Sequence, residues 1–468
     1  MKIIIFGTGL YWSNRKKYVL DACDIVCFLD NNSEKWNQKF CGKLIYSPEN
    51  ILHYEFDYVV IMCKSQDEVY NQLIDLGVPD QKIITYNQYR QTCIKDYYVS
   101  YGPHIDVDYD VVVISTELGY NGGTIAAIYA VKALQSRGKH VLLCAEDCNE
   151  KLLSELIADD IEVLIVPSLP FEVNNILMYH IKNCKMVLVN VFQMLPVVCQ
   201  LNGIKAILWW IHEPYNFYKP ILEEYPQYNV AYLLDNVNVM AVSRIAKNNF
   251  NNLVYNMIND TLTYGIPDTS KKNYIRDMGE NKITFAVVGP VIERKAQDIY
   301  IDAIKQLSND EMDKSRFYII GFYDNGEYAS RIIEEAKSLK NIIITGNLTR
   351  EEMDNIYSEI DIVVCPSREE TMSIVLTESM MYGKPCIGSD NTGMADYIDD
   401  GVNGFVCKTE DAEDLCEKMR YFIHNPERIN EMGQEARKVY EEYFTMDKFA
   451  DRLCAAMDET INLFNNDK

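Results

Sequence analysis

The stretch from residue 361 to residue 390, DIVVCPSREETMSIVLTESMMYGKPCIGSD, decides the fold of this chain. Two short apolar runs, DIVVCPS and KPCIGSD, enclose a segment, MSIVLTESMMYG, that has the pattern of a helix. Gly383 ends that segment, as the glycine after a helix commonly does. Apolar runs without polar alternation are typical of parallel strands covered on both faces by helices. The stretch therefore predicts a strand, a loop, a helix and a second strand of an α/β domain.

Units of this kind recur along the chain. An apolar strand, a glycine turn and an amphipathic helix begin at three places, KIIIFGTG (2–9), DVVVISTELGYNGGT (110–124) and ITFAVVGP (283–290). Further apolar runs follow them: DIVCFLDNN and FDYVVIMC after the first; HVLLCAE, EVLIVPS, MVLVNVF, AILWWIHE and VNVMAVS after the second; FYIIGFY, NIIITGNL and GFVCK after the third. The alternation predicts three α/β domains with mostly parallel sheets.

Domain boundaries follow from these units. We predict an accessory domain at 1–95, a second domain at 106–268 and a third at 269–444. The amphipathic segment 445–465 lies beyond the third sheet and is expected to complete the second domain. The stretch 90–110 has no period and contains a Gly-Pro pair, so we interpret it as a linker.

Composition limits the partners. Of the 468 residues, 48% are hydrophobic and 24% charged, which is typical of a globular protein. The net charge of −24 argues against nucleic acid as a partner. The 14 cysteines show no paired C-x-x-C motifs, so reduced thiols and no zinc site are expected. The N-terminus begins directly with a strand pattern, unlike a signal peptide. Polar residues interrupt the most apolar region, 185–211. These two features predict a cytoplasmic protein without a membrane span.

Two acids, Glu370 and Glu378, lie on either side of the start of the predicted helix at residues 372–383. Ligands of open α/β sheets bind beyond the carboxyl ends of the strands, and amides at a helix N-terminus favour anions. The amides of Met372, Ser373 and Ile374 are therefore candidates for holding a diphosphate. Glu378, about one turn further, could accept hydrogen bonds from both hydroxyls of a ribose, and Glu370 from sugar hydroxyls on the other side. A solvated loop acid and an exposed helix acid fit the spacing equally well.

The segment 366–406 resembles the signature of glycosyltransferase family 4, whose members are retaining enzymes with the GT-B fold. It has the Pro-Ser, a Glu, seven residues, a second Glu, Gly-x-Pro, a glycine-rich loop, an acid and a Gly-x-x-Gly turn. Asp396 stands where the family usually has Glu. Resemblance extends from about residue 109 to the C-terminus, and it implies two Rossmann-like domains facing a cleft, after an additional N-terminal Rossmann-like α/β domain.

The resemblance assigns roles to the candidate residues. Glu378 would bind the donor ribose, Glu370 the donor sugar, and the amides from Met372 to Ile374 the diphosphate. Met372 and Ser373, after Thr371, stand where the family has Phe-Gly, so this sequence departs from the usual sugar pocket.

Two further motifs match the family. In VVGPVIERKAQD (287–298), which resembles the phosphate clamp, Lys295 matches the clamp lysine, Pro290 replaces the clamp arginine, and Arg294 is a candidate to supply that charge. His212 follows an apolar strand where the family has a histidine that contacts a donor-sugar hydroxyl. The alternatives are a solvated lysine and a structural histidine.

Two loops complete the predicted site. In ELGYNGGT, Gly122 and Gly123 allow close approach of the backbone to an acceptor or diphosphate, and the helix from Thr124 points its amides there. TGNL (345–348) resembles the turn that receives the nucleobase, which would involve Gly346, Asn347 and Leu348. DVDYD (106–110) has the spacing of an Asp-x-Asp metal motif but precedes its strand, so we predict no metal there.

The first domain resembles the Rossmann-like modules of some sugar acyltransferases and methyltransferases. Gly7 and Gly9 of a dinucleotide fingerprint are present, but Trp12 replaces its third glycine, and Asp30 belongs to a common LDNN strand end. A ligand site and a module for docking or oligomer assembly both remain open for residues 1–95.

The resulting hypothesis is a metal-independent, cofactor-free, retaining glycosyltransferase, with His212, Glu370 and Lys295 as its catalytic set. Its partners would be a nucleotide-sugar donor and a saccharide or lipid-linked acceptor in bacterial surface polysaccharide or glycoconjugate synthesis, with peripheral contact to the inner face of the cell membrane left open. The alternatives are a nucleotide-sugar epimerase of the same fold and a catalytically silent nucleotide-sugar-binding subunit of a polysaccharide assembly complex. An NAD-dependent oxidoreductase is disfavoured by the missing third glycine.

Overall fold

The computed structural model describes residues 1–103, 108–228, 230, 237–254, 258, 260–270 and 282–466. Asp106, where the second domain was predicted to begin and the DVDYD motif starts, lies outside the described residues. The chain forms two compact units: unit 1 comprises residues 1–106, 116–118 and 144–183, and unit 2 comprises residues 107–115, 119–143 and 184–468.

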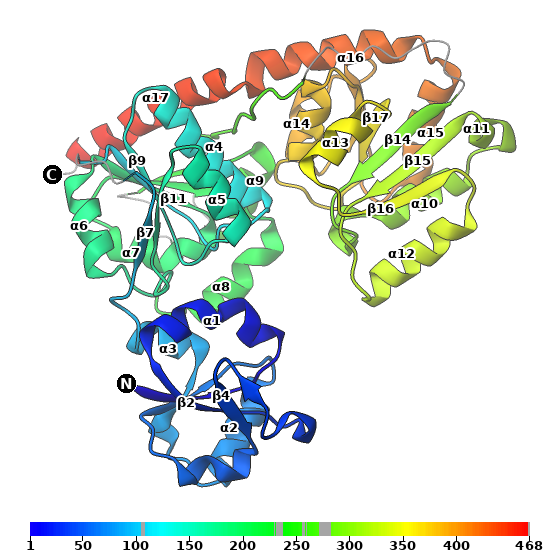
Figure 1. The fold of residues 1–468 in the computed structure, drawn as a ribbon. Coiled ribbons are helices and arrows are strands. Elements are labelled where there is room, and N and C mark those ends of the chain that lie inside the picture. The colour runs from blue at the N-terminus through cyan, green and yellow to red at the C-terminus, as the bar shows by residue number, and fades with distance from the viewer. Residues whose placement is uncertain are drawn as a thin grey trace. The chain divides into compact units, whose positions relative to one another are not determined.

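The N-terminal sheet, blue in Figure 1, belongs to unit 1 and has the strand order β3-β4-β2-β1-β5-β6. All neighbouring strands are parallel except β3 and β4, as the apolar runs predicted. Its core consists of strand residues such as Phe6 and Val59 packed against α2 residues such as Leu73. The elements are β1 Lys2–Phe6, α1 Leu10–Ala22, β2 Asp24–Leu29, β3 Lys39–Phe40, β4 Lys43–Tyr46, β5 Tyr58–Ile61, α2 Gln66–Asp75, β6 Ile83–Thr85 and α3 Tyr86–Thr92.

The glycine turn of this domain packs closely against the neighbouring backbone and side chains of the same domain. Gly7 has a φ of +114°, and a Cβ there would lie 2.6 Å from the carbonyl oxygen of Met62. Asp30 Oδ2 accepts hydrogen bonds from the amide of Thr8 at 3.2 Å and from Lys35 Nζ at 2.8 Å. The acid of the broken fingerprint is therefore already engaged within the domain.

The second sheet has seven strands in the order β13-β12-β11-β8-β9-β10-β7. Strand β7 (Val99–Tyr101) pairs antiparallel with β10, Tyr101 opposite Val163. The interpretation of 90–110 as a linker was therefore wrong for these three residues, because a strand so short shows no period, and also for residues 90–92, which end α3. The other elements are β8 Val111–Ile114, α4 Gly122–Ser136, β9 Val141–Ala145, α5 Glu150–Ala158, β10 Glu162–Ile165, α6 Asn175–Asn183, β11 Met186–Asn190, α7 Leu195–Leu201, β12 Ile207–Ile211, α8 Tyr218–Glu224, β13 Asn238–Ala241 and α9 Arg244–Val254.

The third sheet is fully parallel and has the order β16-β15-β14-β17-β18-β19, as predicted. Side chains such as Phe285, Phe317 and Leu415 form its core. The elements are β14 Ile283–Val288, α10 Gln297–Lys305, α11 Asn309–Asp313, β15 Ser315–Ile320, α12 Glu327–Ser338, β16 Ile342–Gly346, α13 Arg350–Tyr357, β17 Ile362–Cys365, α14 Ile374–Met381, β18 Cys386–Ser389, β19 Gly404–Cys407 and α15 Ala412–His424.

The C-terminal helices form a continuous path within unit 2. Helix α16 (Arg428–Val439) leads through a π-helical turn into α17 (Met446–Asn466), drawn in orange to red in Figure 1. Helix α17 packs against α4, where Arg137 forms ion pairs with Asp447 at 3.0 Å and with Asp451 at 2.8 Å. These contacts join α17 to α4, the helix that follows β8.

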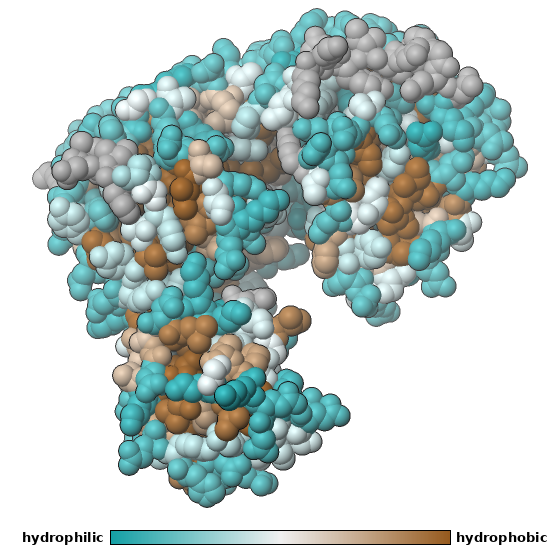
Figure 2. Space-filling model, viewed as in Figure 1, coloured by the Kyte–Doolittle hydropathy of each residue, from teal (hydrophilic) through white to brown (hydrophobic). Residues whose placement is uncertain are grey.

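The visible surface in Figure 2 is mostly hydrophilic, with hydrophobic residues gathered in small patches, some of them on the N-terminal domain. Among the described residues, no helix combines the length and apolar character that crossing a bilayer requires. The fourteen cysteines are all free thiols.

Candidate active site

A cavity of about 590 Å³ in unit 2 brings together most of the predicted site residues. It is lined by the loops that follow β8, β12, β14 and β17, as expected for ligand sites of parallel sheets. The predicted residues that line it are Gly122, Gly123, His212, Arg294, Lys295, Glu370, Thr371, Met372, Ser373 and Ile374.

Helix α14 directs its N-terminus at this cavity. It begins at Ile374, two residues later than the sequence pattern indicated, because Ser373 serves as its N-cap and accepts a hydrogen bond from the amide of Leu376 at 3.3 Å. Gly383 follows the helix with a φ of +67°, the left-handed conformation of a C-terminal cap. The partial positive charge of the helix therefore lies at the cavity wall.

Glu370 lies at the centre of the charges in the cavity. Its side chain is buried, and Oε2 accepts from Arg294 Nη1 at 2.9 Å and from Lys295 Nζ. Burial opposes ionisation, but the charges of Lys295 and Arg294 outweigh it and lower the pKa of Glu370. The carboxylate is therefore ionised and already paired with both candidate phosphate-binding cations.

The two cations come from a short turn, Glu293–Lys295, that follows β14. Arg294 Nη1 also donates to the carbonyl of Glu369 at 3.0 Å, and the amide of Arg368 donates to the carbonyl of Arg294 at 2.9 Å. These bonds hold the turn against the loop before α14, so Arg294 occupies the cavity beside Lys295 although Pro290 replaces the expected arginine.

His212 lines the cavity and has an unsatisfied ring nitrogen. Burial lowers its pKa to about 3, so the imidazole is neutral near pH 7. Its Nε2 is buried and has no hydrogen-bond partner among the described residues. Buried polar atoms are nearly always paired in folded proteins, so this nitrogen is a candidate contact for a ligand hydroxyl.

The glycine loop after β8 forms another wall. Asn121 caps α4, accepting from the amide of Thr124 at 3.0 Å, and the Asn190 side chain donates to the carbonyl of Gly123 at 3.1 Å. Thr124 itself is buried, at 1% exposure, and does not line the cavity. Tyr120 and Asn121 do line it, and the sequence analysis missed both; an asparagine directly before two glycines at a helix start was the available signal.

Comparison with known proteins identifies the family. Residues 270–439 match the model of the glycosyl transferases group 1, and residues 1–84 match the model called C2185-like, N-terminal. Residues 270–439 of this chain therefore form a domain of the group 1 glycosyl transferase type. The expected family is thereby confirmed.

Known relatives share only part of the length of this chain. Sulfoquinovosyl transferase SQD2 of Arabidopsis thaliana is 30% identical over 148 residues, which are 31% of this chain and 29% of SQD2. O-antigen chain mannosyltransferase C of Escherichia coli is 30% identical over 147 residues, 30% of this chain and 39% of that protein. The chain thus spans less than two thirds of the length of these relatives.

Solved structures confirm the predicted GT-B fold. Anabaena Alr3699/HepE, in complex with UDP and glucose, superposes with a TM-score of 0.60 at 15% identity over 75% of this chain and all of that one. Sucrose-phosphate synthase from Thermosynechococcus elongatus has a TM-score of 0.59 at 15% identity over 75% of this chain and 98% of that one.

Besides Thr124, four predicted residues lie outside the lining of the cavity. Glu378 is half-buried on α14, where the Tyr357 hydroxyl donates to its Oε2 at 3.1 Å. The turn after β16 holds the other three, Gly346, Asn347 and Leu348, with Gly346 at a φ of +72°. Their roles toward ribose and nucleobase stay predictions.

Glu213 is a buried acid that sequence reasoning passed over. It accepts hydrogen bonds from the amides of Phe192 at 2.5 Å and His212 at 2.9 Å. Burial raises its pKa to about 7 in spite of these bonds. Because Glu213 binds the backbone of His212 and does not line the cavity, we regard it as a residue that positions His212.

The loop before α14 also contacts residues that follow β12 and β13 in unit 2. The carbonyl of Thr371 accepts from Ser243 Oγ at 2.5 Å, and Thr371 Oγ1 donates to the carbonyl of His212 at 2.6 Å. Arg244 forms a bidentate pair with Asp396 at 2.6 to 3.0 Å. Asp396, which replaces the family's usual Glu, therefore contacts a helix that follows the second sheet.

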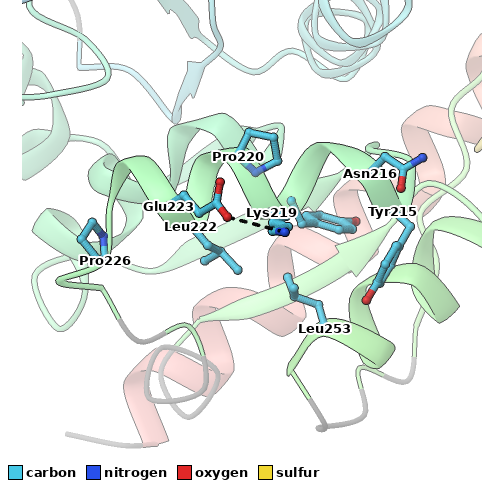
Figure 3. A pocket seen from close by; sticks show the side chains of 9 residues that line it. Tyr215, Asn216, Lys219, Pro220, Leu222, Glu223, Pro226 and Leu253 are labelled. Atoms are coloured by element: carbon cyan, nitrogen blue, oxygen red, sulfur yellow. Dashed lines mark ion pairs between the residues drawn. The ribbon is translucent and has the colours of Figure 1, made fainter.

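A larger cavity of about 820 Å³ lies along α8, where Figure 3 shows mainly apolar and aromatic side chains around it. Tyr215 lines it, and Lys219 and Glu223 form its one drawn ion pair at 3.7 Å. None of the predicted catalytic residues lines this cavity.

Proposed function

We propose that the protein is a retaining glycosyltransferase that transfers a sugar from a nucleotide-sugar donor to an acceptor hydroxyl. One observation carries the proposal: Lys295, Arg294 and the N-terminus of α14 converge on a single cavity. Two cations and a helix N-terminus are suited to a leaving nucleoside diphosphate, whose charge grows in the transition state.

In this proposal the side chains of the cavity have separate roles. Lys295 and Arg294 stabilise the diphosphate, which makes a metal ion unnecessary in this proposal. His212, neutral and with its free Nε2, orients a hydroxyl of the donor sugar. Retention follows if the departing phosphate oxygen takes the proton of the acceptor hydroxyl on the face from which it leaves, so that no protein nucleophile is needed.

We propose a further role for Glu370 beside the predicted contact with the donor sugar. Its Oε2 is bound by both cations, so it neutralises them before the diphosphate arrives. We propose that donor binding releases the cations from this carboxylate, which then becomes available to sugar hydroxyls.

The donor class draws support from a similar structure. Anabaena Alr3699/HepE was solved with UDP-glucose, so UDP-sugars are the first donors to test here. The similarity to an O-antigen mannosyltransferase supports polysaccharide or glycoconjugate synthesis as the context. Location in the cytoplasm, at the inner face of the membrane for a lipid-linked acceptor, stays a prediction.

An epimerase is less well supported. It needs an acid and a base that exchange protons near neutral pH. Among the described residues that line the cavity, Glu370 has a lowered pKa and His212 a pKa near 3, and both are poorly suited to that exchange.

The decisive experiment measures melting temperature and slow hydrolysis with a panel of nucleotide sugars, for the wild type, Lys295→Ala and Glu378→Ala. We expect one donor to stabilise the wild type, and both variants to lose that shift. Lys337→Ala, an exposed lysine of the same domain, serves as the control and should behave as wild type. A wild type that binds a nucleotide sugar without hydrolysing it would favour the catalytically silent subunit, and one that binds no nucleotide sugar would contradict the proposal.

A further inference from the structure

A second polar cavity, of about 290 Å³, lies in unit 1. We call it the α1–α3 cavity, because Tyr11 and Arg15 of α1 and Asn87 of α3 line it together with Glu117, Glu146 and Asp147 from the loops after β8 and β9. It shares no residue with the catalytic cavity. Its volume is at the lower end of the roughly 300 to 1,000 Å³ usual for small-molecule sites.

The walls of the α1–α3 cavity are held rigidly. Arg90 donates to the Glu146 carboxylate and to two backbone carbonyls of the loop after β10. The Tyr18 hydroxyl donates to Asp147, whose carbonyl accepts from the amide of Leu118 at 2.8 Å. The loops are thus fixed to each other and to α1 and α3, so a ligand would meet a preorganised site.

Hydrogen-bonding groups in this rigid cavity remain open. Arg15 packs 4.1 Å above the ring of Tyr11, and neither its guanidinium nor the Asn87 amide has a hydrogen bond within the described part of the chain. Glu146 uses only Oε2 and Asp147 only Oδ1 for side-chain bonding, so each keeps a second oxygen without a partner among the described residues.

The cavity contains both carboxylates and guanidinium groups, and this mixture favours a neutral ligand. A phosphate would meet three carboxylates, and a metal ion or amine would meet two guanidinium groups, Arg15 and Arg90. A neutral hydroxyl both donates and accepts, so it pairs with an open carboxylate oxygen and an open N–H at once. Tyr11, which is half-buried, also lines the cavity and adds an aromatic wall to these polar groups.

We propose that the α1–α3 cavity binds a neutral saccharide, and that this saccharide is part of the acceptor. The second half of this statement rests on the proposed transferase function. In the sequence, the loop after β8 contributes Glu117 to this cavity and Tyr120 to the catalytic cavity. The N-terminal domain is then an acceptor-recognition module, which gives residues 1–95 a role beyond docking.

The test uses the full-length chain. Fluorescently labelled protein is applied to a microarray of hexoses, N-acetylhexosamines, uronic acids and their short oligosaccharides, and each hit is titrated calorimetrically. The variant Arg15→Ala/Asn87→Ala removes two side chains that make no hydrogen bond in the described structure and loses the contact of Arg15 with the Tyr11 ring, so its melting temperature should lie only slightly below that of the wild type. Lys16→Ala, exposed on the same helix, is the matched control.

We expect the wild type and Lys16→Ala to bind one class of neutral saccharide, and Arg15→Ala/Asn87→Ala to bind it at least tenfold more weakly. The rise in melting temperature that a nucleotide sugar produces should be the same for the wild type, Lys16→Ala and Arg15→Ala/Asn87→Ala. Equal saccharide affinity in the double variant, preference for uronic acids, or no hit for the wild type would overturn the site. If the protein binds a saccharide but no nucleotide sugar, the α1–α3 cavity is a saccharide site, and the proposal that this saccharide is part of an acceptor is refuted.

Discussion

Arg294 Nη1 lies 2.9 Å from Oε2 of Glu370, the same oxygen that accepts from Lys295. One carboxylate therefore holds the two cations that the proposed reaction needs for a diphosphate. Removing one partner of a buried ion pair leaves the other charge uncompensated, which makes this relationship accessible to experiment.

Glu370→Gln should lower the melting temperature of the free protein, because Lys295 and Arg294 lose their counter-charge. The same change should increase the stabilisation produced by UDP, since the diphosphate no longer competes with a carboxylate. Thermal unfolding with and without UDP measures both effects. An equal UDP shift in wild type and variant would contradict the idea that Glu370 occupies the anion site.

His212→Ala should reduce kcat/KM by about tenfold, the effect of losing one hydrogen bond to a donor hydroxyl. Because the pKa of His212 is about 3, the imidazole stays neutral throughout the usual assay range and contributes no inflection to the pH–rate profile. Profiles of wild type and variant recorded across the neutral range should differ in height and agree in shape. A change of shape would mean that His212 titrates during turnover.

Glu213 should make stability depend on pH. Its pKa rises from an ordinary value of 4.5 to about 7 in the folded protein, so between these values the folded state holds a proton that the unfolded chain has released. The resulting stabilisation, up to about 3 kcal/mol, is complete below pH 4.5 and is lost as pH rises through 7.

Urea unfolding of wild type and Glu213→Gln, at one pH below and one above the folded-state pKa of about 7, tests this directly. The wild type should lose more free energy of unfolding between the two pH values than the variant does, since all other titrations are common to both. The substituted amide also loses one backbone hydrogen bond, but that loss is the same at every pH. Parallel pH dependences would show that Glu213 does not titrate in this range.

Gly393→Ala should disturb the loop that carries Glu370. A Cβ at Gly393 would lie 2.0 Å from the carbonyl oxygen of Thr371 and 2.7 Å from Ser243 Oγ, so the loop must move. We expect a loss of stability of about 1 to 3 kcal/mol, the usual cost of overpacking, and a larger proportional loss of donor binding. Gly9→Ala is the control, because a Cβ there meets nothing within 4 Å; similar losses in both variants would contradict the prediction.

Local sequence determined most of the strands, but not the short β3, β4 and β7; it also determined the order of the α/β units and the helix before Gly383. Each of these depends on neighbours within about ten residues, through apolar runs, helical spacing and a glycine that adopts a positive φ. The residues of the cavity could be named from motifs for the same reason, since each motif lies at the carboxyl end of a strand.

Tertiary structure alone decided what those residues contact. Glu370 and Lys295 are 75 residues apart, and only the pairing of β14 with β17 brings their loops together. The raised pKa of Glu213 arises from burial, which the acidic residue itself does not reveal. The α1–α3 cavity is built from segments near residues 11, 87, 117 and 147, so no single stretch of sequence contains it. Charge pairing, burial and cavities are properties of packed side chains, and packing is set by contacts between residues distant in sequence.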